Sequence, residues 1–163
     1  MRSALALLMV LASIVATATE ESWQLVGEAR LKVLFWPVYD SRLYSLDGGF
    51  QQGQRPLRLE IRYLREVAAA DLVENTQKEW RRLGGVPPQS EQWLQQLAQM
   101  WPDVVAGDVL ELQVDASGLS IFRVNGQWLG AVEDSEFGKH FLNIWLSPET
   151  SRPDLRLALI GED

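Results

Sequence analysis

The segment from Leu25 to Ser45, LVGEARLKVLFWPVYDSRLYS, constrains the fold most, because it is the longest uninterrupted run of strand-forming residues. Successive side chains of a strand point to opposite faces. An apolar face is therefore expected to carry Ala29, Leu31, Val33 and Phe35, and a mixed face Glu28, Arg30, Lys32, Leu34 and Trp36. Pro37 cannot donate to a sheet ladder, which predicts a break or bulge there and a second strand from about Val38 to Tyr44. The segment is thus predicted to form a long hairpin or a bent strand.

Arg30 is the unusual residue of the mixed face, since it places a cation beside the aliphatic Leu34 and the aromatic Trp36. One interpretation is an exposed strand face on which the guanidinium is simply solvated. The other is a cleft in which Arg30 is buried and meets a ligand. The alternation of residues does not choose between them.

The rest of the chain reads as strands and helices joined by clear turn signals. Alternating apolar residues predict strands, helical periodicity predicts helices, and Asn125-Gly126 is a strong hairpin signal. The strands are predicted at 57–64, 109–114, 119–124 and 127–132, and the helices at 68–83, 90–101, 136–146 and 153–160. This order predicts an α+β fold with an antiparallel sheet that is covered on one side.

The first residues have the pattern of an export signal. Arg2 gives a short positive start, Ala4–Val15 is apolar and uncharged, and Ala16-Thr17-Ala18 fits a signal peptidase site. The apolar run is shorter than the roughly 20 residues that a membrane span needs. We expect a signal peptide at residues 1–18, one domain at 19–163, and a periplasmic location.

Composition narrows the classes of function. With 47% hydrophobic residues the chain can build one core, and its formal net charge of −7 disfavours nucleic acid and anionic lipid headgroups as partners. We expect no nucleic acid partner and no stable membrane insertion. The absence of cysteine excludes disulfides and thiol chemistry, and His140 is the single histidine. These counts disfavour a multi-histidine metal site and a Ser-His-Asp triad, so no metal and no cofactor are expected.

Three short motifs occur in the order and spacing of a known family. They are G-x-x-R followed by V-Y-x-x-x-L-Y across Gly27–Tyr44, ENTQKEW at Glu74–Trp80, and NIWLSP at Asn143–Pro148. Together they resemble the chalcone isomerase family over nearly the whole predicted domain, and the chain is most similar to its exported bacterial chalcone isomerase-like members. The resemblance implies an open-faced β-sandwich, an antiparallel sheet with helices packed on one side.

The resemblance also implies a ligand-binding cleft between the sheet and the helices. The family's arginine falls on Arg30, its threonine on Tyr39 and its helix asparagine on Asn75, and the hydroxyl residue of its closing helix falls near Asn143. The family's tyrosine has no counterpart, because Ala68–Ala70 stand where it should precede Asn75.

This departure implies a cleft without the isomerase chemistry. Non-catalytic branches of the fold resemble fatty-acid binders in which the arginine pairs with the carboxylate, and an arginine fork suits that task. We therefore expect a small amphipathic or fatty-acid-like ligand, with Arg30 buried and its guanidinium facing the cavity. The alternatives are an intramolecular lyase or isomerase on an unknown substrate, and an interaction protein that binds no ligand.

Overall fold

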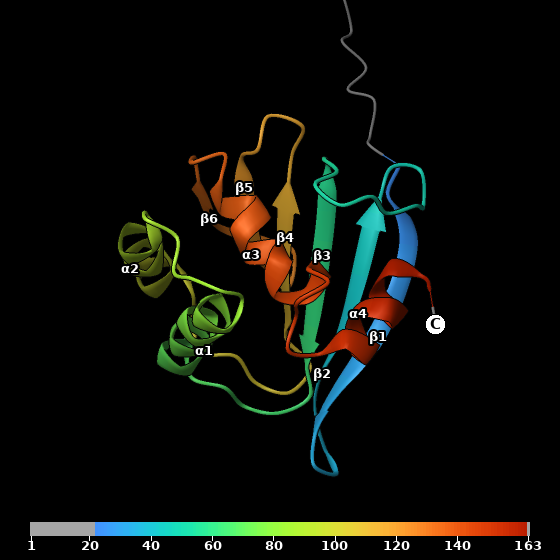
Figure 1. Ribbon diagram of the computed structural model, residues 1–163. Helices are drawn as coiled ribbons and strands as arrows, with labels where there is room; N and C mark the ends of the chain where they lie inside the picture. Colours follow the sequence, from blue (N-terminus) through green and yellow to red (C-terminus); the bar gives the residue numbers. More distant parts are fainter. Residues whose placement is uncertain (1–21, 163) are drawn as a thin grey trace, which may run out of the picture.

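The computed structural model describes residues 22–162, and these form six strands and four helices (Figure 1). The strands form one antiparallel sheet in sequential order, from β1 to β6. The elements are β1 (Gln24–Val33), β2 (Trp36–Ser45), β3 (Leu57–Tyr63), α1 (Ala69–Arg82), α2 (Ser90–Met100), β4 (Val109–Val114), β5 (Ser120–Val124), β6 (Gln127–Val132), α3 (Phe137–Leu146) and α4 (Pro153–Ile160). The predicted α+β class is confirmed. The predicted signal peptide, residues 1–18, lies outside the described residues.

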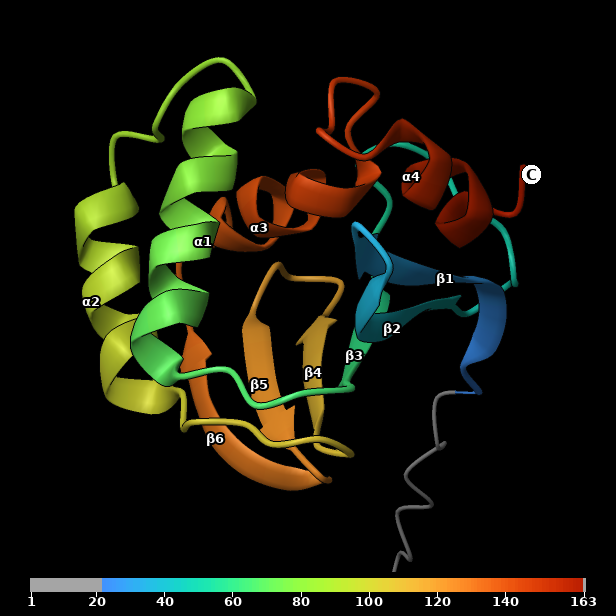
Figure 2. The same ribbon diagram turned by 90° about the horizontal axis from the view of Figure 1, so that it is seen from below.

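The helices cover one face of the sheet and leave the other open, as Figure 2 shows. Strand β3 explains why. Leu57, Leu59, Ile61 and Tyr63 are at most 5% exposed, and the residues between them carry the charges of the opposite face. A strand with this alternation can bury one face only, so the helices must pack there.

An aromatic cluster joins the helices to the sheet. Trp80 of α1, Trp93 of α2 and Phe137 of α3 meet edge to face, with ring centroids 5.5 to 6.5 Å apart. The two indole N–H groups also have partners, because Trp80 donates to the carbonyl of His140 and Trp93 donates to Asp134. Such rings bury large apolar areas, and the bonded indoles avoid the cost of a buried unpaired donor. The cluster fixes α3 between the helix pair and the sheet.

Helix α4 lies directly on β1. A Cβ at Gly27 would overlap the carbonyl oxygen of Ala158 and crowd that of Leu159, so the two backbones approach as only glycine allows. Leu155 and Leu159 of α4 are buried in this contact region. The packing of α4, the last helix, therefore stabilises β1, the first strand of the sheet.

The open face of the sheet carries a ladder of charges. Cross-strand ion pairs join Arg42 to Glu28 at 3.0 Å and Arg123 to Glu111 at 2.8 Å. Arg58 lies 4.6 Å over the ring of Trp23 and reaches the same Glu111 at 3.9 Å. Opposite charges on facing strands stabilise the pairing modestly and keep this face soluble.

The hairpin of β1 and β2 corrects part of the sequence interpretation. Its turn falls at Leu34-Phe35, and Pro37 lies inside β2 opposite Lys32, so the second strand begins before the proline. The bulge predicted at Pro37 is confirmed, because the register shifts between Pro37 and Tyr39. Val33 and Phe35, expected on the core face, are 46% and 93% exposed. The ribbon runs past the end of the neighbouring strand, so its apolar side there has nothing to pack against.

Candidate functional site

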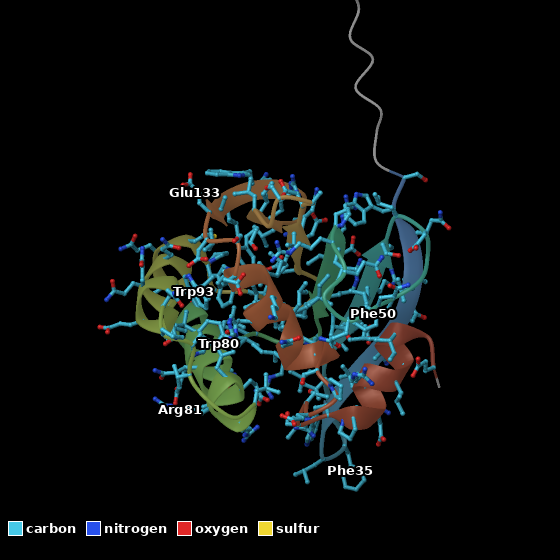
Figure 3. All side chains as sticks on the ribbon, turned by 45° about the horizontal axis from the view of Figure 1, so that its top comes forward. Phe35, Phe50, Trp80, Arg81, Trp93 and Glu133 are labelled. Atoms are coloured by element: carbon cyan, nitrogen blue, oxygen red, sulfur yellow. The ribbon has the colours of Figure 1, made fainter. Side chains whose placement is uncertain are left out.

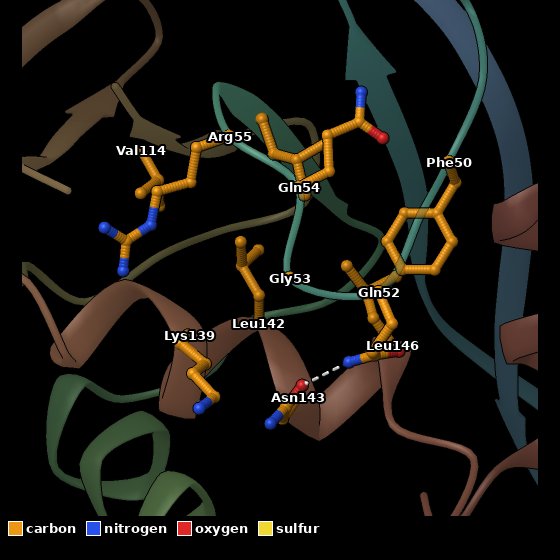
Figure 4. A pocket seen from close by; sticks show the side chains of 11 residues that line it. Phe50, Gln52, Gly53, Gln54, Arg55, Val114, Lys139, Leu142, Asn143 and Leu146 are labelled. Atoms are coloured by element: carbon orange, nitrogen blue, oxygen red, sulfur yellow. Dashed lines mark hydrogen bonds between the residues drawn. The ribbon is translucent and has the colours of Figure 1, made fainter. Parts of the chain in front are cut away.

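Helix α3 forms one wall of a hollow of about 210 Å³, which we call the α3 hollow. The loop before β3 and the ends of β3 and β4 form the other walls (Figure 4). The lining residues are Phe50, Gln52, Gly53, Gln54, Arg55, Leu57, Val114, Lys139, Leu142, Asn143 and Leu146. Figure 4 shows Arg55 and Lys139 toward one end of the hollow and Phe50 at the other. The hollow is thus assembled from segments that are distant in sequence.

The α3 hollow has an apolar floor and a polar, basic rim. Leucine, valine and phenylalanine side chains of the sheet, the loop and α3 make the floor. The rim carries the cations of Arg55 and Lys139 and the amides of the loop glutamines, and none of the lining residues is acidic. Arg55 is oriented by its Nη2, which donates to the carbonyl of Ser135 at 2.6 Å, while Lys139 is exposed. An apolar floor below two cations is complementary to an amphipathic anion.

A second hollow of about 370 Å³ lies across α3 from the first. It is bounded by the end of α1, the loop at Gly84–Pro87, and His140, Asn143 and Ser147. Asn143 lines both hollows, and its Oδ1 accepts a hydrogen bond of 3.0 Å from Gln52. This residue is therefore the polar link between the two sides of α3.

Tyr39 lies beneath α3 on the helix-covered face of the sheet. Its hydroxyl accepts a hydrogen bond of 3.0 Å from Nε1 of Trp145, and its ring meets that of Tyr63 edge-on at 6.2 Å. Burial raises the pKa of Tyr39 to about 12. The hydroxyl is therefore protonated at neutral pH, where it can donate one hydrogen bond but is a poor general base.

Arg30 lies on the open face of the sheet, on the opposite side from Tyr39. Its Nε and Nη2 donate to the two carboxylate oxygens of Asp40 at 2.6 and 2.9 Å. The hydrogen bond and charge of Asp40 raise the pKa of Arg30, and the same hydrogen bond lowers the pKa of Asp40. Because its side chain is 52% exposed, the expectation of a buried arginine facing a cavity is wrong. Strand parity had grouped Arg30 correctly with the mixed face, and that face is the uncovered one.

The chain is similar to known proteins both in sequence and in fold. The chalcone isomerase-like family matches at residues 15–161. The chain belongs to the chalcone isomerase-like family. An uncharacterized protein of Haemophilus influenzae is 26% identical over 140 residues, which are 86% of this chain and 69% of that protein. The crystal structure of a fatty-acid binding protein from Arabidopsis thaliana superposes with a TM-score of 0.66 at 12% identity, covering 86% of this chain and 87% of that one. At that identity the superposition shows a shared fold.

The structure of this chalcone isomerase-like chain does not gather the predicted site residues into one cluster. Asn75 is exposed on α1, Arg30 lies on the open face, and Tyr39 and Asn143 are both adjacent to α3. Their role in contacting a ligand stays a prediction, and the geometry favours the pair near α3 over the other two.

Sequence reasoning missed Arg55 and Lys139, the cations at the rim of the α3 hollow. One signal for the hollow was present. Leu142 and Leu146 form a second apolar edge of α3, beyond the face that packs into the aromatic core. That edge indicated a further partner for α3, which is the loop before β3 together with Leu57 and Val114.

Residues 22–162 show no sign of two other classes of site, a metal centre and a membrane-spanning helix. In this range no group of three or more histidine, cysteine, aspartate or glutamate side chains could hold a metal ion. None of the helices in the same range is long and apolar enough to cross a membrane. The expected absence of a cofactor stays a prediction.

Proposed function

We propose that this chalcone isomerase-like protein binds a small amphipathic anion of the acyl type in the α3 hollow. The observation that carries the proposal is the apolar floor next to Arg55 and Lys139 in a lining without acidic residues. A carboxylate would lie at the cationic end and its hydrocarbon chain over Leu142, Leu146 and Phe50. In a chain with net charge −7, such a local positive rim gives an anion a defined place to bind.

The size of the hollow limits the ligand. Pockets for small molecules usually measure about 300–1,000 Å³, and the α3 hollow is smaller, at about 210 Å³. A short or medium acyl chain therefore suits it better than a long one. The Arabidopsis protein that shares the fold is described as a fatty-acid binding protein, which supports the same ligand class here.

We also propose that the protein works after export. The charged start, the apolar run and the Ala-x-Ala site at residues 1–18 support this location. Native mass spectrometry of protein from a periplasmic extract tests both points together. The chain mass would show cleavage after Ala18, and a retained mass would identify the ligand class. A chemically altered ligand released after incubation would instead favour the isomerase alternative, and an empty protein the interaction protein.

A fluorescence titration tests the ligand chemistry, with octanoate compared against the neutral alcohol of the same length. Lys139→Ala is the informative variant, because Arg55 also holds Ser135 and its loss would disturb the loop. Lys78→Ala, an exposed lysine on α1 away from the hollow, is the matched control. We expect Lys139→Ala to weaken octanoate binding by about two- to fivefold, the range for an exposed charge pair, and to leave the alcohol unaffected. Equal losses in both lysine variants would contradict the proposal.

A further inference from the structure

The β1–β2 hairpin extends beyond the rest of the sheet. Strand β3 pairs with β2 only as far as Tyr39, with one further hydrogen bond from Leu64 N to Val38 O. Residues Lys32–Pro37, which we call the overhang, pair only with each other. Two residues of each strand and the two turn residues project here, or roughly 10 Å at the usual rise per residue. Figure 1 shows the hairpin tip beyond all the other elements at that end.

The overhang carries exposed apolar side chains at its tip. Val33 is 46% exposed, Leu34 86%, Phe35 93% and Trp36 73%. Figure 3 shows Phe35 at the extremity of the molecule, away from the core. Single exposed apolar residues are ordinary, but a contiguous group on a projecting element marks an interaction site.

The residues of the turn are also not the ones that would make it most stable. Leu34 has a φ of 56°, whereas Phe35 is not among the residues with a positive φ. A positive φ at the first central position is the pattern of a type II′ turn, where glycine is the usual residue because a Cβ is strained there. A leucine in this place sacrifices turn stability for a large apolar side chain. Strain of this kind in a native structure points to a functional demand on the residue.

We propose that the overhang inserts into the interface of a phospholipid bilayer. The side chains of Leu34 and Phe35 would enter the acyl boundary, Trp36 would lie at the headgroup level, and Lys32 would face the lipid phosphate. Tryptophan is enriched at this depth because its ring is amphipathic. Interfacial elements bury roughly 5–10 Å, which matches the length of the overhang, so the body of the protein would stay outside.

A bilayer fits the overhang better than a protein partner does. A standard protein interface uses about 20–30 residues on each side, whereas the apolar group spans only Val33–Trp36 on a narrow convex tip. A fluid interface can close around such a tip without a preformed groove. The overhang contains Lys32 and no acidic residue, and the nearest carboxylate along the ribbon, Asp40, is paired with Arg30. The net charge of −7 therefore lies on the rest of the protein, where anionic headgroups would repel it, and we expect a preference for zwitterionic lipids.

Vesicle sedimentation tests this proposal with the full domain and phosphatidylcholine vesicles at low and high salt. The test variant combines Leu34→Gly with Phe35→Asn, residues that suit the turn and remove its apolar tip. The matched control is Leu25→Ser, which removes a 50% exposed leucine at the other end of the same strand. We expect the wild type and the control to sediment with vesicles at both salt concentrations, and the tip variant to bind at least about tenfold more weakly.

Three further measurements distinguish a loss of vesicle binding from misfolding and from damage to the ligand site. The tip variant should unfold in urea at the same concentration as the wild type or a higher one, and it should bind octanoate unchanged. Bromine-labelled lipid should quench the fluorescence of the wild type more than that of Trp36→Phe. Failure of the wild type to bind vesicles, or equal binding by the tip variant, would overturn the proposal. A lipid-free dimer that the tip variant abolishes would assign the tip to a second copy of the chain instead.

Discussion

The two edges of the sheet end in hairpins with two-residue turns, and the turns differ in chemistry. At Asn125-Gly126 both residues have positive φ, 50° and 79°, which is the type I′ geometry that Asn-Gly favours. The Asn125 side chain adds bonds of 2.9 Å to Val109 N and to Asp108. At Leu34-Phe35 the turn has one positive φ, occupied by a leucine, and its side chains are exposed.

The difference shows that a turn can be specified in two ways. The β5–β6 turn is encoded locally by the conformational preference of its two residues, and the hydrogen bonds of Asn125 with Asp108 and Val109 stabilise it further. The β1–β2 turn is imposed by the long pairing on both sides of it, from Gln24↔Ser45 to Val33↔Trp36. The pairing of the flanking strands offsets the strain at Leu34. The residues at the tip therefore do not have to be good turn formers, and they can serve binding instead.

Placing the residue types of the β1–β2 turn in the β5–β6 turn should give the largest loss of stability. Asn125→Leu with Gly126→Phe places two side chains with Cβ atoms at positive φ, and the left-handed region costs about 1–2 kcal/mol for each L-residue. We expect the free energy of unfolding to fall by roughly 2–4 kcal/mol in urea titrations. The reciprocal tip variant, Leu34→Gly with Phe35→Asn, should lose nothing. If both exchanges cost the same, the two turns are not specified differently.

Alkaline pH should weaken the β1–β2 side of the sheet next most strongly. All three tyrosines lie on β2 and β3, and burial raises the pKa of Tyr63 and brings that of Tyr39 to about 12. Since the unfolded tyrosine ionises near 10, the stabilisation by neutral Tyr39 is complete below pH 10 and is lost as pH rises toward 12. The loss is of order 2–3 kcal/mol. Tyrosinate absorbance and circular dichroism followed together check this.

The variant Tyr39→Phe provides the control for the pH effect. It keeps the ring and removes the ionisable hydroxyl, so its alkaline transition should shift to higher pH. Ionisation of Tyr39 near pH 10 in the folded protein would show that the base of the β1–β2 ribbon is open to water.

Two cross-strand ion pairs, one joining β5 to β4 and one within the β1–β2 hairpin, should give the smallest effects. Arg123 is 29% exposed and donates to Glu111 and Gln113, so Arg123→Ala should cost roughly 1 kcal/mol. Arg30→Ala removes an exposed pair with Asp40 and should leave both the urea midpoint and octanoate affinity unchanged. A clear loss of octanoate binding in Arg30→Ala would restore the arginine as the ligand anchor.

Local patterns in the sequence were sufficient for most of the fold. The alternation at Leu57–Tyr63 and the Asn-Gly pair at 125–126 can each be recognised from a few adjacent residues, so strands, helices and the α+β class could be predicted. The position of the first hairpin could not. Alternation shows which residues share a face, but not how far the neighbouring strand reaches, and Val33 and Phe35 lie beyond the point where β3 ends.

The candidate site was harder to predict because it is built by long-range contacts. Arg55 belongs to a polar loop and Lys139 to a helix, and only the packing of that loop against α3 brings them to one hollow. Asn143 and Tyr39 came from the family resemblance, and the structure places both next to α3. The same resemblance placed Arg30 on the wrong side of the sheet, because a motif does not record which face its residues take.

The close contact at Gly27 has a consequence for how the chain acquires its structure. The strand next to the N-terminal end is covered by the helix nearest the C-terminal end, with backbone against backbone at Ala158. A chain that emerges from a ribosome or a translocation pore in order cannot bury β1 until α4 has appeared. Contacts of such long sequence separation form late and slow folding. The side of β1 that α4 covers is therefore the surface that stays exposed to aggregation longest during synthesis.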